Sequence, residues 1–324
     1  MAKTKRSAKI WLIVAAALSV LGLVMFGVAI AAAGFDLSLF STVEYETNTY
    51  EISESFEGIS IITDIADIII ENSDDGSCRV VCYEESKATH SVTVKGDTLT
   101  IEASNDKRWY EYIGVGFEST SITVYLPDGV YKDLSINVDT GDTRIEGDLL
   151  FESINVKADT GDVINHAWAT EDITIKTDTG DITVEDVYAG KLELDVSTGR
   201  ISVSDVNCVG EIQHKCSTGK AQFEKVNCNS FTSSGDTGDI SLTGVLVTDE
   251  MNVKRDTGKV VFDSSDAAKI TVKTSTGDVI GSLLTEKNFS VSTSTGGVEI
   301  PESTAGGKCE ITTSTGDVNI SIAK

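Results

Sequence analysis

Apolar and polar residues alternate around a four-residue motif, Asp/Ser-Thr-Gly-x, that recurs from residue 131 to the end of the chain. Successive motif glycines are 19 or 20 residues apart. They are Gly141, Gly161, Gly180, Gly199, Gly219, Gly238, Gly258, Gly277, Gly296 and Gly316. A fixed period in this range is typical of a solenoid.

The alternation brackets each glycine on both sides. In most repeats apolar residues stand seven and five positions before the glycine and two after it, as Ile154, Val156 and Val163 do in the second repeat. A period of two indicates a strand, a sharp corner and a second strand, and the 3.6 period of a helical solenoid is absent. We therefore predict an all-β fold, a single parallel β-solenoid of about ten rungs over residues 131–324.

The corner has a local explanation. Asp or Ser before the threonine can accept a hydrogen bond from the backbone two residues on, and glycine supplies a positive φ. Rungs stacked about 4.8 Å apart would pair each backbone with its neighbours and align equivalent side chains in columns.

Residues 36–130 are rich in strand patterns but lack the regular motif. We predict that they form the irregular opening of the solenoid and cover its first regular rung, as terminal repeats must. The signals are a degenerate rung at 61–68, strands at 91–94, 99–102 and 122–126, and a hairpin turn at 95–97.

At the other end, the chain stops eight residues after Gly316 without an obvious capping helix. An uncovered last rung would expose a strand edge. We expect Asn319, Ser321 and Lys324 to blunt that edge, and end-to-end association of solenoids is the alternative.

The N-terminus has the pattern of a membrane anchor. Residues 1–9 carry four basic residues and no acid, and residues 10–35 carry no charge. A helix of that length spans roughly 39 Å, more than the ~30 Å hydrocarbon core. We predict a cytoplasmic tail (1–9), a transmembrane signal-anchor helix (10–35) and an extracytoplasmic remainder, hence a single-pass protein of the cell membrane. Ala31-Ala32-Ala33 keeps a cleaved signal peptide open as an alternative.

The predicted outer part is strongly acidic. Removing the four basic residues of the tail from the total of 26 leaves 22 against 51 acids, a net charge of −29. Such a surface argues against nucleic acid or anionic lipid as a ligand and suits solubility, divalent cations or basic partners.

Two tandem stretches carry a family resemblance. Residues 122–128 read ITVYLPD and residues 134–142 read LSINVDTGD, followed by copies of the second. Together with the repeat they resemble the bacterial "putative adhesin" domain of unknown function, over about residues 43–324. The resemblance implies an envelope protein with β-helical repeats, adhesive or tied to envelope-stress signalling, and it supplies no catalytic residues.

Paired acids at the first three corners suggest a calcium site. The pairs are Asp139 and Asp142, Asp159 and Asp162, and Asp178 and Asp181. Calcium takes six to eight oxygen ligands and would relieve repulsion between stacked carboxylates. However, the calcium-binding GGxGxD repeat is missing, and cations such as Arg200 and Lys220 interrupt the later corners. Solvated aspartates that only form the turn are the competing interpretation.

The six cysteines show no CxxC spacing, which argues against a zinc ribbon or a thioredoxin-like site. Cys208 and Cys228 occupy equivalent places 20 residues apart, so their thiols should stack. Core packing, a disulfide, or a soft-metal site with His214 are three open readings. Arg255 falls at a nominally inward position beside Gly235 and Cys216, from which it could also extend outward or pair with an acid such as Asp236. Trp109, Tyr110 and Tyr112 form an aromatic loop that suits sugar or protein contacts, and the alternative is a loop folded back over the open end of the solenoid.

No group of residues has the pattern of a catalytic site. The three histidines are scattered, no nucleophile elbow is present, and no acid pair stands out as glycoside hydrolysis would require. We predict a non-catalytic adhesion, interaction or envelope-stress-sensing scaffold without a cofactor, calcium aside. Its partners would be the membrane, through the N-terminal helix, and envelope proteins or surface polysaccharide. The alternatives are a carbohydrate-active β-helix enzyme and a passive spacer.

Overall fold

A computed structural model of the protein describes residues 2–32, 34–35, 43–104, 118–303 and 305–323. The chain divides into two compact units. The first comprises Met1–Glu46, Glu85–Lys87 and Asp106–Ser119, and the second comprises Thr47–Glu84, Ala88–Asn105 and Thr120–Lys324.

The first unit contains the one helix of the described residues, α1 (Ala2–Ala32). Its segment Trp11–Ala32 is long and apolar enough to cross a membrane. Just after the helix, Gly34 and Phe35 have positive φ, and the N–H of Gly34 donates to the carbonyl of Ala31 at 3.1 Å. This is the way helices commonly end, since a left-handed residue lets the chain satisfy the last carbonyls.

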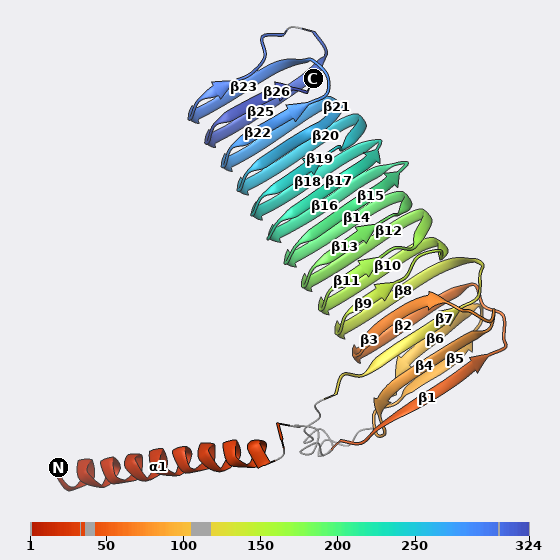
Figure 1. Cartoon of the computed structure of the whole chain (residues 1–324), viewed down its shortest axis with the longest axis vertical. Coiled ribbons are helices and arrows are strands. Elements are labelled where there is room, and N and C mark those ends of the chain that lie inside the picture. Colours follow the sequence, from red (N-terminus) through yellow and green to blue (C-terminus); the bar gives the residue numbers. More distant parts are fainter. Residues whose placement is uncertain (1, 33, 36–42, 105–117, 304, 324) are drawn as a thin grey trace. The chain divides into compact units, whose positions relative to one another are not determined.

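The second unit is a β-solenoid of two facing rows of strands (Figure 1), as the sequence predicts. One row consists of long strands that end at the Thr-Gly corner. They are β8 (Val130–Thr140), β10 (Leu150–Thr160), β12 (Trp168–Thr179), β14 (Tyr188–Thr198), β16 (Glu211–Thr218), β18 (Ser230–Thr237), β20 (Leu246–Thr257) and the second half of β21 (Val260–Thr276). The other row follows the corner. It contains β9 (Thr143–Ile145), β11 (Val163–Asn165), β13 (Ile182–Glu185), β15 (Ile201–Cys208), β17 (Ala221–Cys228), β19 (Ile240–Thr243) and the first half of β21.

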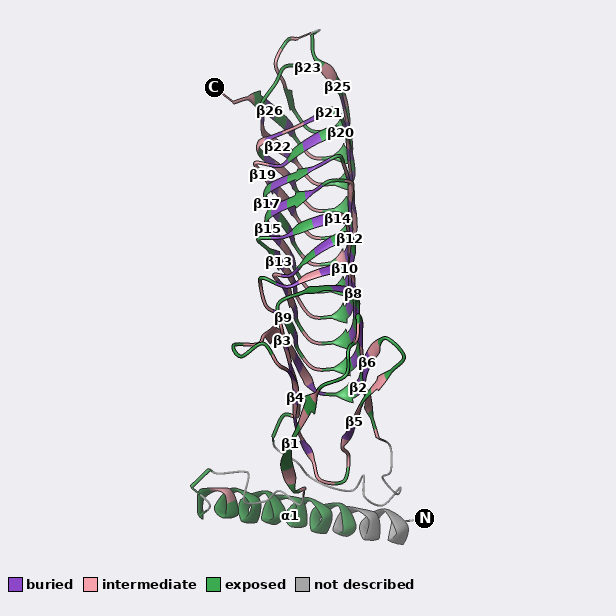
Figure 2. Ribbon diagram, turned by 90° about the vertical axis from the view of Figure 1, so that its right-hand side faces the viewer, coloured by how far each residue is buried: buried purple, intermediate pink, exposed green. Residues whose placement is uncertain are grey.

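Neighbouring rungs pair in parallel and in register, so that equivalent side chains stack. Ile154 of β10, for example, aligns with Leu134 of β8 and with Ile173 of β12. Along most strands, buried residues alternate with more exposed ones (Figure 2). The buried residues form one continuous hydrophobic core. Side chains of Ile, Leu and Val dominate this core. Each rung therefore depends on its neighbours to bury its apolar face.

The first corner requires glycine for two reasons. All ten motif glycines have φ between 132° and 153°, a region that L side chains rarely adopt. At Gly161 an added Cβ would also overlap the carbonyl oxygen of Gly141 in the preceding rung. The close approach lets the Gly161 N–H donate to the carbonyl of Thr179 in the next rung at 2.9 Å.

Each rung has a second corner, which returns the chain to the row of long strands. Six residues after the glycine, a residue with positive φ reverses the chain in five consecutive rungs. These residues are Asp186, Asp205, Lys225, Gly244 and Ser264.

The irregular N-terminal segment closes one end of the solenoid. Strands β2 (Gly58–Ile65) and β3 (Asp67–Asn72) form the degenerate rung and pair with β8 and β9. The next layer is shared by β6 (Thr98–Ala103) and β7 (Ser121–Leu126). Antiparallel strands follow outside it: β5 (His90–Lys95) in the predicted hairpin with β6, and β4 (Cys78–Glu85) between β7 and β1 (Tyr45–Ile52).

At the opposite end, the order of rungs in space differs from their order in sequence. Strand β25 (Gly307–Thr315) lies between β21 and β23 (Lys287–Thr295), and β26 (Val318–Ile322) lies between β22 (Val279–Leu283) and β24 (Val298–Glu299). The last rung of the chain is therefore inserted, and the preceding rung is outermost.

The expectation that the C-terminal rung forms the exposed edge is accordingly wrong. Asn319, one of the residues expected to blunt that edge, donates instead to Glu299 of the covering rung at 3.1 Å. Ser321 donates to the carbonyl of Gly281 at 3.2 Å, and Lys324 lies outside the described residues.

Candidate functional site

A groove of about 550 Å³ runs over the second corners of consecutive rungs, within residues 207–287. Its outer lining includes Asn207, Asn227, Leu246 and Asp266. These four residues are register partners in adjacent rungs, so they form one column along the solenoid axis. Volumes of a few hundred Å³ are typical of ligand sites.

The same column continues beyond the groove toward the N-terminal end. Tyr188 aligns with Asn207, and Trp168 precedes Ala169, which aligns with the residue that follows Tyr188. We call this row the second-corner column. It consists of Trp168, Tyr188, Asn207, Asn227, Leu246 and Asp266.

The backbone of the second corner places these side chains outward. Asn207 lies between Val206 and Cys208, both of which point into the core, and the alternation of a strand then turns Asn207 toward solvent. The same buried-exposed-buried order surrounds Asn227 in the next rung. Because side chains alternate between the two faces of a strand, the same position is exposed in each rung, and these exposed side chains form a row along the solenoid axis.

The two aromatic residues of the column combine exposure with a fixed position. Trp168 has 49% of its surface exposed and Tyr188 has 37%. The indole Nε1 of Trp168 donates to the carbonyl of Asp186 at 2.8 Å. Because Asp186 belongs to the neighbouring corner, this bond anchors the ring across two rungs while leaving much of it accessible.

The floor of the groove is uncharged. It contains Cys208 and Cys228, whose Sγ atoms are buried. Burial raises the pKa of the Cys228 thiol to about 12, and the neighbouring Cys208 adds to the shift. Burial also raises the pKa of Cys208, so both groups are protonated thiols at neutral pH. All six cysteines are free in the structure, and the Cys208–Cys228 disulfide stays a prediction.

An ion pair closes the C-terminal end of the groove. The Nζ atom of Lys287 lies 2.5 Å from Oδ1 of Asp266 and donates to the carbonyl of Ala267 and to Oγ1 of Thr285, both at 2.8 Å. Lys287 is only 3% exposed. The ammonium group is thus fully engaged and the carboxylate is neutralised.

The six predicted calcium ligands lie along the first corner, away from the second-corner column. Three of them take part in a backbone ladder: Oδ1 of Asp142 accepts from the N–H of Asp162, Oδ1 of Asp162 from that of Asp181, and Oδ1 of Asp181 from that of Arg200, at 2.7–2.8 Å. The ladder gives these three carboxylates a structural task, since each joins its own rung to the next.

The other three predicted ligands, Asp139, Asp159 and Asp178, are exposed at the same corners. Later in the ladder a lysine neutralises the carboxylate, since Lys259 Nζ lies 3.0 Å from Asp278 Oδ2. The hydrogen bond from Lys259 lowers the pKa of Asp278, and the N–H of Asp317 adds to the effect. Calcium binding at the first three corners stays a prediction.

The structure places His214 in a buried cluster rather than beside the two stacked thiols. Its ring packs edge-on against Phe223 with centroids 4.8 Å apart, and its Nε2 lies 3.2 Å from Nη2 of Arg255. Of the alternatives left open for Arg255, the structure shows the side chain pointing inward, because Gly235 leaves the space that its guanidinium fills. The aromatic loop of Trp109, Tyr110 and Tyr112 lies outside the described residues.

The second-corner column is not among the sites that the sequence patterns predict. The signal is present, because Tyr188, Asn207, Asn227, Leu246 and Asp266 all stand eight residues after a motif glycine. Predicting that this position is exposed requires knowing that a second corner follows the strand after each Thr-Gly corner.

Comparison with known proteins identifies relatives of this fold. The family described as Toastrack DUF4097 matches residues 56–213 and 207–324. No curated protein matches the sequence.

Several solved bacterial structures resemble the chain. A "putative adhesin" from Parabacteroides distasonis ATCC 8503 is 14% identical, with a TM-score of 0.50 over 74% of this chain and 97% of that one. A "putative adhesin" from Bacteroides fragilis NCTC 9343 is 15% identical (TM-score 0.42, 86% and 97% covered). A "putative lipid binding protein" from Parabacteroides distasonis ATCC 8503 is also 15% identical (0.43, 73% and 94%). At these identities the likeness concerns the fold alone.

Proposed function

The chain belongs to the Toastrack DUF4097 family, and from its fold and exposed side chains we propose that it is a membrane-anchored, extracytoplasmic adhesion module. In this proposal α1 tethers the protein to the cell membrane and the solenoid binds neutral surface polysaccharide along the second-corner column. The name "putative adhesin" of a solved structure with the same fold agrees with such a role.

The second-corner column carries the proposal. Trp168 and Tyr188 present aromatic surface, and Asn207 and Asn227 present amide donors and acceptors, in adjacent rungs of one exposed row. Aromatic faces pack against the C–H faces of sugar rings, while amides exchange hydrogen bonds with hydroxyl groups. Rungs repeat about every 4.8 Å, which is comparable to the length of one sugar residue in an extended chain. A polysaccharide lying along the axis would therefore meet one side chain of the column per residue.

The charge of the molecule favours a neutral ligand. The predicted outer part has a net charge of −29, whereas the groove is lined mainly by uncharged Asn, Thr, Val, Leu and Cys side chains, and its two charged residues, Asp266 and Lys287, form an ion pair with each other. Anionic polysaccharides would be repelled at long range, and basic side chains that could recognise them are scarce at the column. Lys287 does not offer such recognition, because it is buried and paired with Asp266.

The same geometry supports binding without catalysis. Asp266 is the one acid among the described residues that line the groove, and its carboxylate is paired with Lys287. Glycoside hydrolysis needs two carboxyl groups at a set separation, one of them able to donate a proton. The groove thus offers a surface for retention of a sugar chain and lacks the acid pair for its cleavage.

Binding of the full chain in detergent to insoluble polysaccharides tests the proposal. We expect retention on neutral polymers such as cellulose or chitin and little on an anionic polymer such as pectate. Trp168→Ala should raise the Kd for a soluble neutral oligosaccharide about tenfold, the equivalent of ~1.4 kcal/mol. Val298→Ala, which removes an exposed apolar side chain elsewhere, should not change it. Release of soluble sugars would support the enzyme alternative, and equal retention of wild type and Trp168→Ala would contradict the assigned site.

A further inference from the structure

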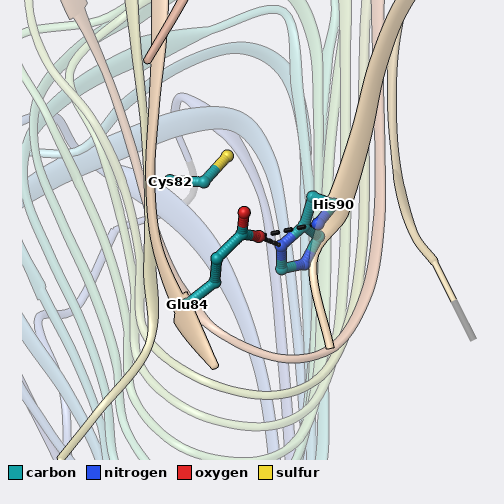
Figure 3. A group of neighbouring side chains, drawn as sticks. All are labelled: Cys82, Glu84 and His90. Atoms are coloured by element: carbon teal, nitrogen blue, oxygen red, sulfur yellow. Dashed lines mark hydrogen bonds and ion pairs between the residues drawn. The ribbon is translucent and has the colours of Figure 1, made fainter. Parts of the chain in front are cut away.

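Three potential metal ligands meet in the interior of the N-terminal cap, the name we give to strands β1–β7 that precede the first regular rung, far in sequence from the second-corner column. Cys82 and Glu84 stand two residues apart on β4 and therefore face the same side. The turn after β4 brings back His90 at the start of β5 (Figure 3). One ligand atom from each residue lies within 4.8 Å of the other two, and the three residues are 0%, 0% and 7% exposed.

The carboxylate of Glu84 is held on both oxygens. Oε1 accepts from Nδ2 of Asn48 at 2.8 Å, and Oε2 accepts from the backbone N–H of His90 and lies 2.6 Å from His90 Nδ1. Among the described residues, His90 is the only basic side chain within ion-pair distance of this carboxylate. A buried carboxylate is costly unless a positive charge or several donors compensate it.

The surroundings of the cluster match the outer shell of a metal site. His90 Nε2 lies 2.9 Å from Oγ1 of the buried Thr63, so Nε2–H can donate to the hydroxyl. In that tautomer Nδ1 carries the lone pair, and it lies 2.6 Å from Oε2 of Glu84. Metal-binding histidines are usually oriented in this way, by a hydrogen bond from the nitrogen that does not bind the metal. Asn48 similarly fixes the orientation of the Glu84 carboxylate, through its hydrogen bond to Oε1.

We propose that Cys82 Sγ, Glu84 Oε and His90 Nδ1 bind one zinc ion inside the cap. Binding would release the thiol proton of Cys82 to solvent, and the proton of His90 would reside on Nε2. The two negative charges of thiolate and carboxylate then balance the charge of Zn²⁺, so that the buried site is neutral.

The donor set selects the metal. One sulfur, one nitrogen and one oxygen are the ligands that zinc takes in tetrahedral sites, and a fourth position remains for water or another oxygen. Calcium and magnesium prefer oxygen ligands only, which argues against them here.

Such a site would have a structural consequence. Cys82 and Glu84 belong to β4, which pairs with β7, and β7 continues the row that follows the Thr-Gly corner. His90 opens β5, which pairs with β6, and β6 continues the row that ends at that corner. A shared ion would join the two rows at the end where no further regular rung covers them. The proposal is independent of polysaccharide binding, since the two sites share no residue.

Metal analysis of the full chain, purified in detergent from cells grown with zinc, tests this proposal. We expect about one zinc per chain, and Co²⁺ in its place should give the near-ultraviolet absorption of a cobalt–thiolate bond. Cys82→Ser should abolish both signals. Thr63→Val, which removes only the partner of His90 Nε2, should weaken zinc binding roughly 10- to 100-fold.

Cys78→Ser is the matched control, because Cys78 is buried on the same face of β4, four residues from Cys82. It should retain zinc and the cobalt–thiolate absorption. Far-ultraviolet circular dichroism shows whether each variant keeps its strands, and Thr63→Val gives the answer if Cys82→Ser does not fold. Absence of zinc from the folded wild-type chain, or equal zinc content in wild type and Cys82→Ser, would overturn the proposal.

Discussion

A corner glycine meets two separate constraints in this fold, and both act on a single Cβ atom. Its φ of about 145° excludes most side chains, and its Cα–H points at the glycine carbonyl of the adjacent rung. The first constraint could be met by a strained residue at some cost, but the second leaves no space at all. This is why the motif never varies at this position over ten corners.

Replacing Gly180 by alanine should therefore destabilise the solenoid strongly. Its φ is 147°, and the added Cβ would overlap the carbonyl group of Gly161. The backbone conformation alone costs about 1–3 kcal/mol, and the overlap adds to it. We expect a lower midpoint in urea unfolding. Gly147→Ala is the control, because the nearest atom to its Cβ would be 3.9 Å away. An unchanged midpoint for Gly180→Ala would contradict the stacking geometry.

His214 should make the stability of the solenoid depend on pH. Burial, together with the neighbouring Arg255, lowers the pKa of His214 to about 3 from its ordinary value near 6.5. The unfolded chain then binds a proton between pH 6.5 and 3 that the folded chain excludes, so this contribution is complete above pH 6.5 and is lost as the pH falls.

The difference in unfolding free energy between wild type and His214→Gln isolates that contribution. It should be constant above pH 7 and should fall by about 1.4 kcal/mol for each pH unit below 6.5. Urea unfolding of both proteins at pH 7.5, 6.5 and 5.5 provides the measurement. A difference that stays flat down to pH 5.5 would show that His214 can take up a proton in the folded state.

At the scale of the element, the first corner is a ladder of backbone N–H groups and aspartate side chains. Each Asp after the glycine accepts from the N–H of the equivalent residue in the next rung, so its carboxylate joins two rungs. This explains why Asp follows the glycine in most rungs even where cations interrupt the column of charge. Only an acceptor oxygen is needed for this task, and a negative charge is not.

Substitutions at Asp162 separate the ladder from calcium binding. Asp162→Asn keeps an oxygen that can accept from Asp181 and should retain most of the stability, whereas Asp162→Ala should lose about 1 kcal/mol. Thermal melting of both variants with and without a chelator makes the comparison. If instead the chelator lowers the midpoint of the wild type, and Asp162→Asn lowers it equally without a chelator, the carboxylates bind calcium.

A structural feature of this size can be predicted from the sequence when the residues that determine it are close together in the chain. The Thr-Gly corner is contained in four residues, and the flanking alternation in about ten, so strands and corners follow from local physics. The second-corner column needs the register of neighbouring rungs as well. The cluster of Cys82, Glu84 and His90 also depends on Asn48 and Thr63, and four different strands bring these five residues together. No spacing in the sequence carries that information.

At the scale of the whole solenoid, the order of rungs is the feature that a period cannot encode. Every regular rung offers its neighbour the same backbone donors, the same corner glycine and similar apolar side chains. Thr276 aligns with Thr315, and Thr295 aligns with Thr315 as well. A rung can therefore exchange neighbours without changing its register, and the connections between rungs decide the order. Here β24 ends at Glu299 and β25 begins at Gly307, and β25 pairs on one side with β21 and on the other with β23, so the final rung lies between its two predecessors.

Cysteine pairs can establish this order directly. Lys273 and Thr312 are exposed register partners in adjacent strands, about 5 Å apart, and a disulfide can join Cα atoms up to ~7 Å apart. Lys273 and Ser292 would be partners if the rungs followed the sequence, but β25 separates them, so their distance is about twice as large. Lys273→Cys with Thr312→Cys should therefore form a disulfide under mild oxidation, and Lys273→Cys with Ser292→Cys should not. Peptide mapping after digestion identifies the bond, and the buried native thiols limit competing reactions. The reverse result would mean that the last rung is the outermost one and that its edge, rather than that of β23 and β24, is open to other chains.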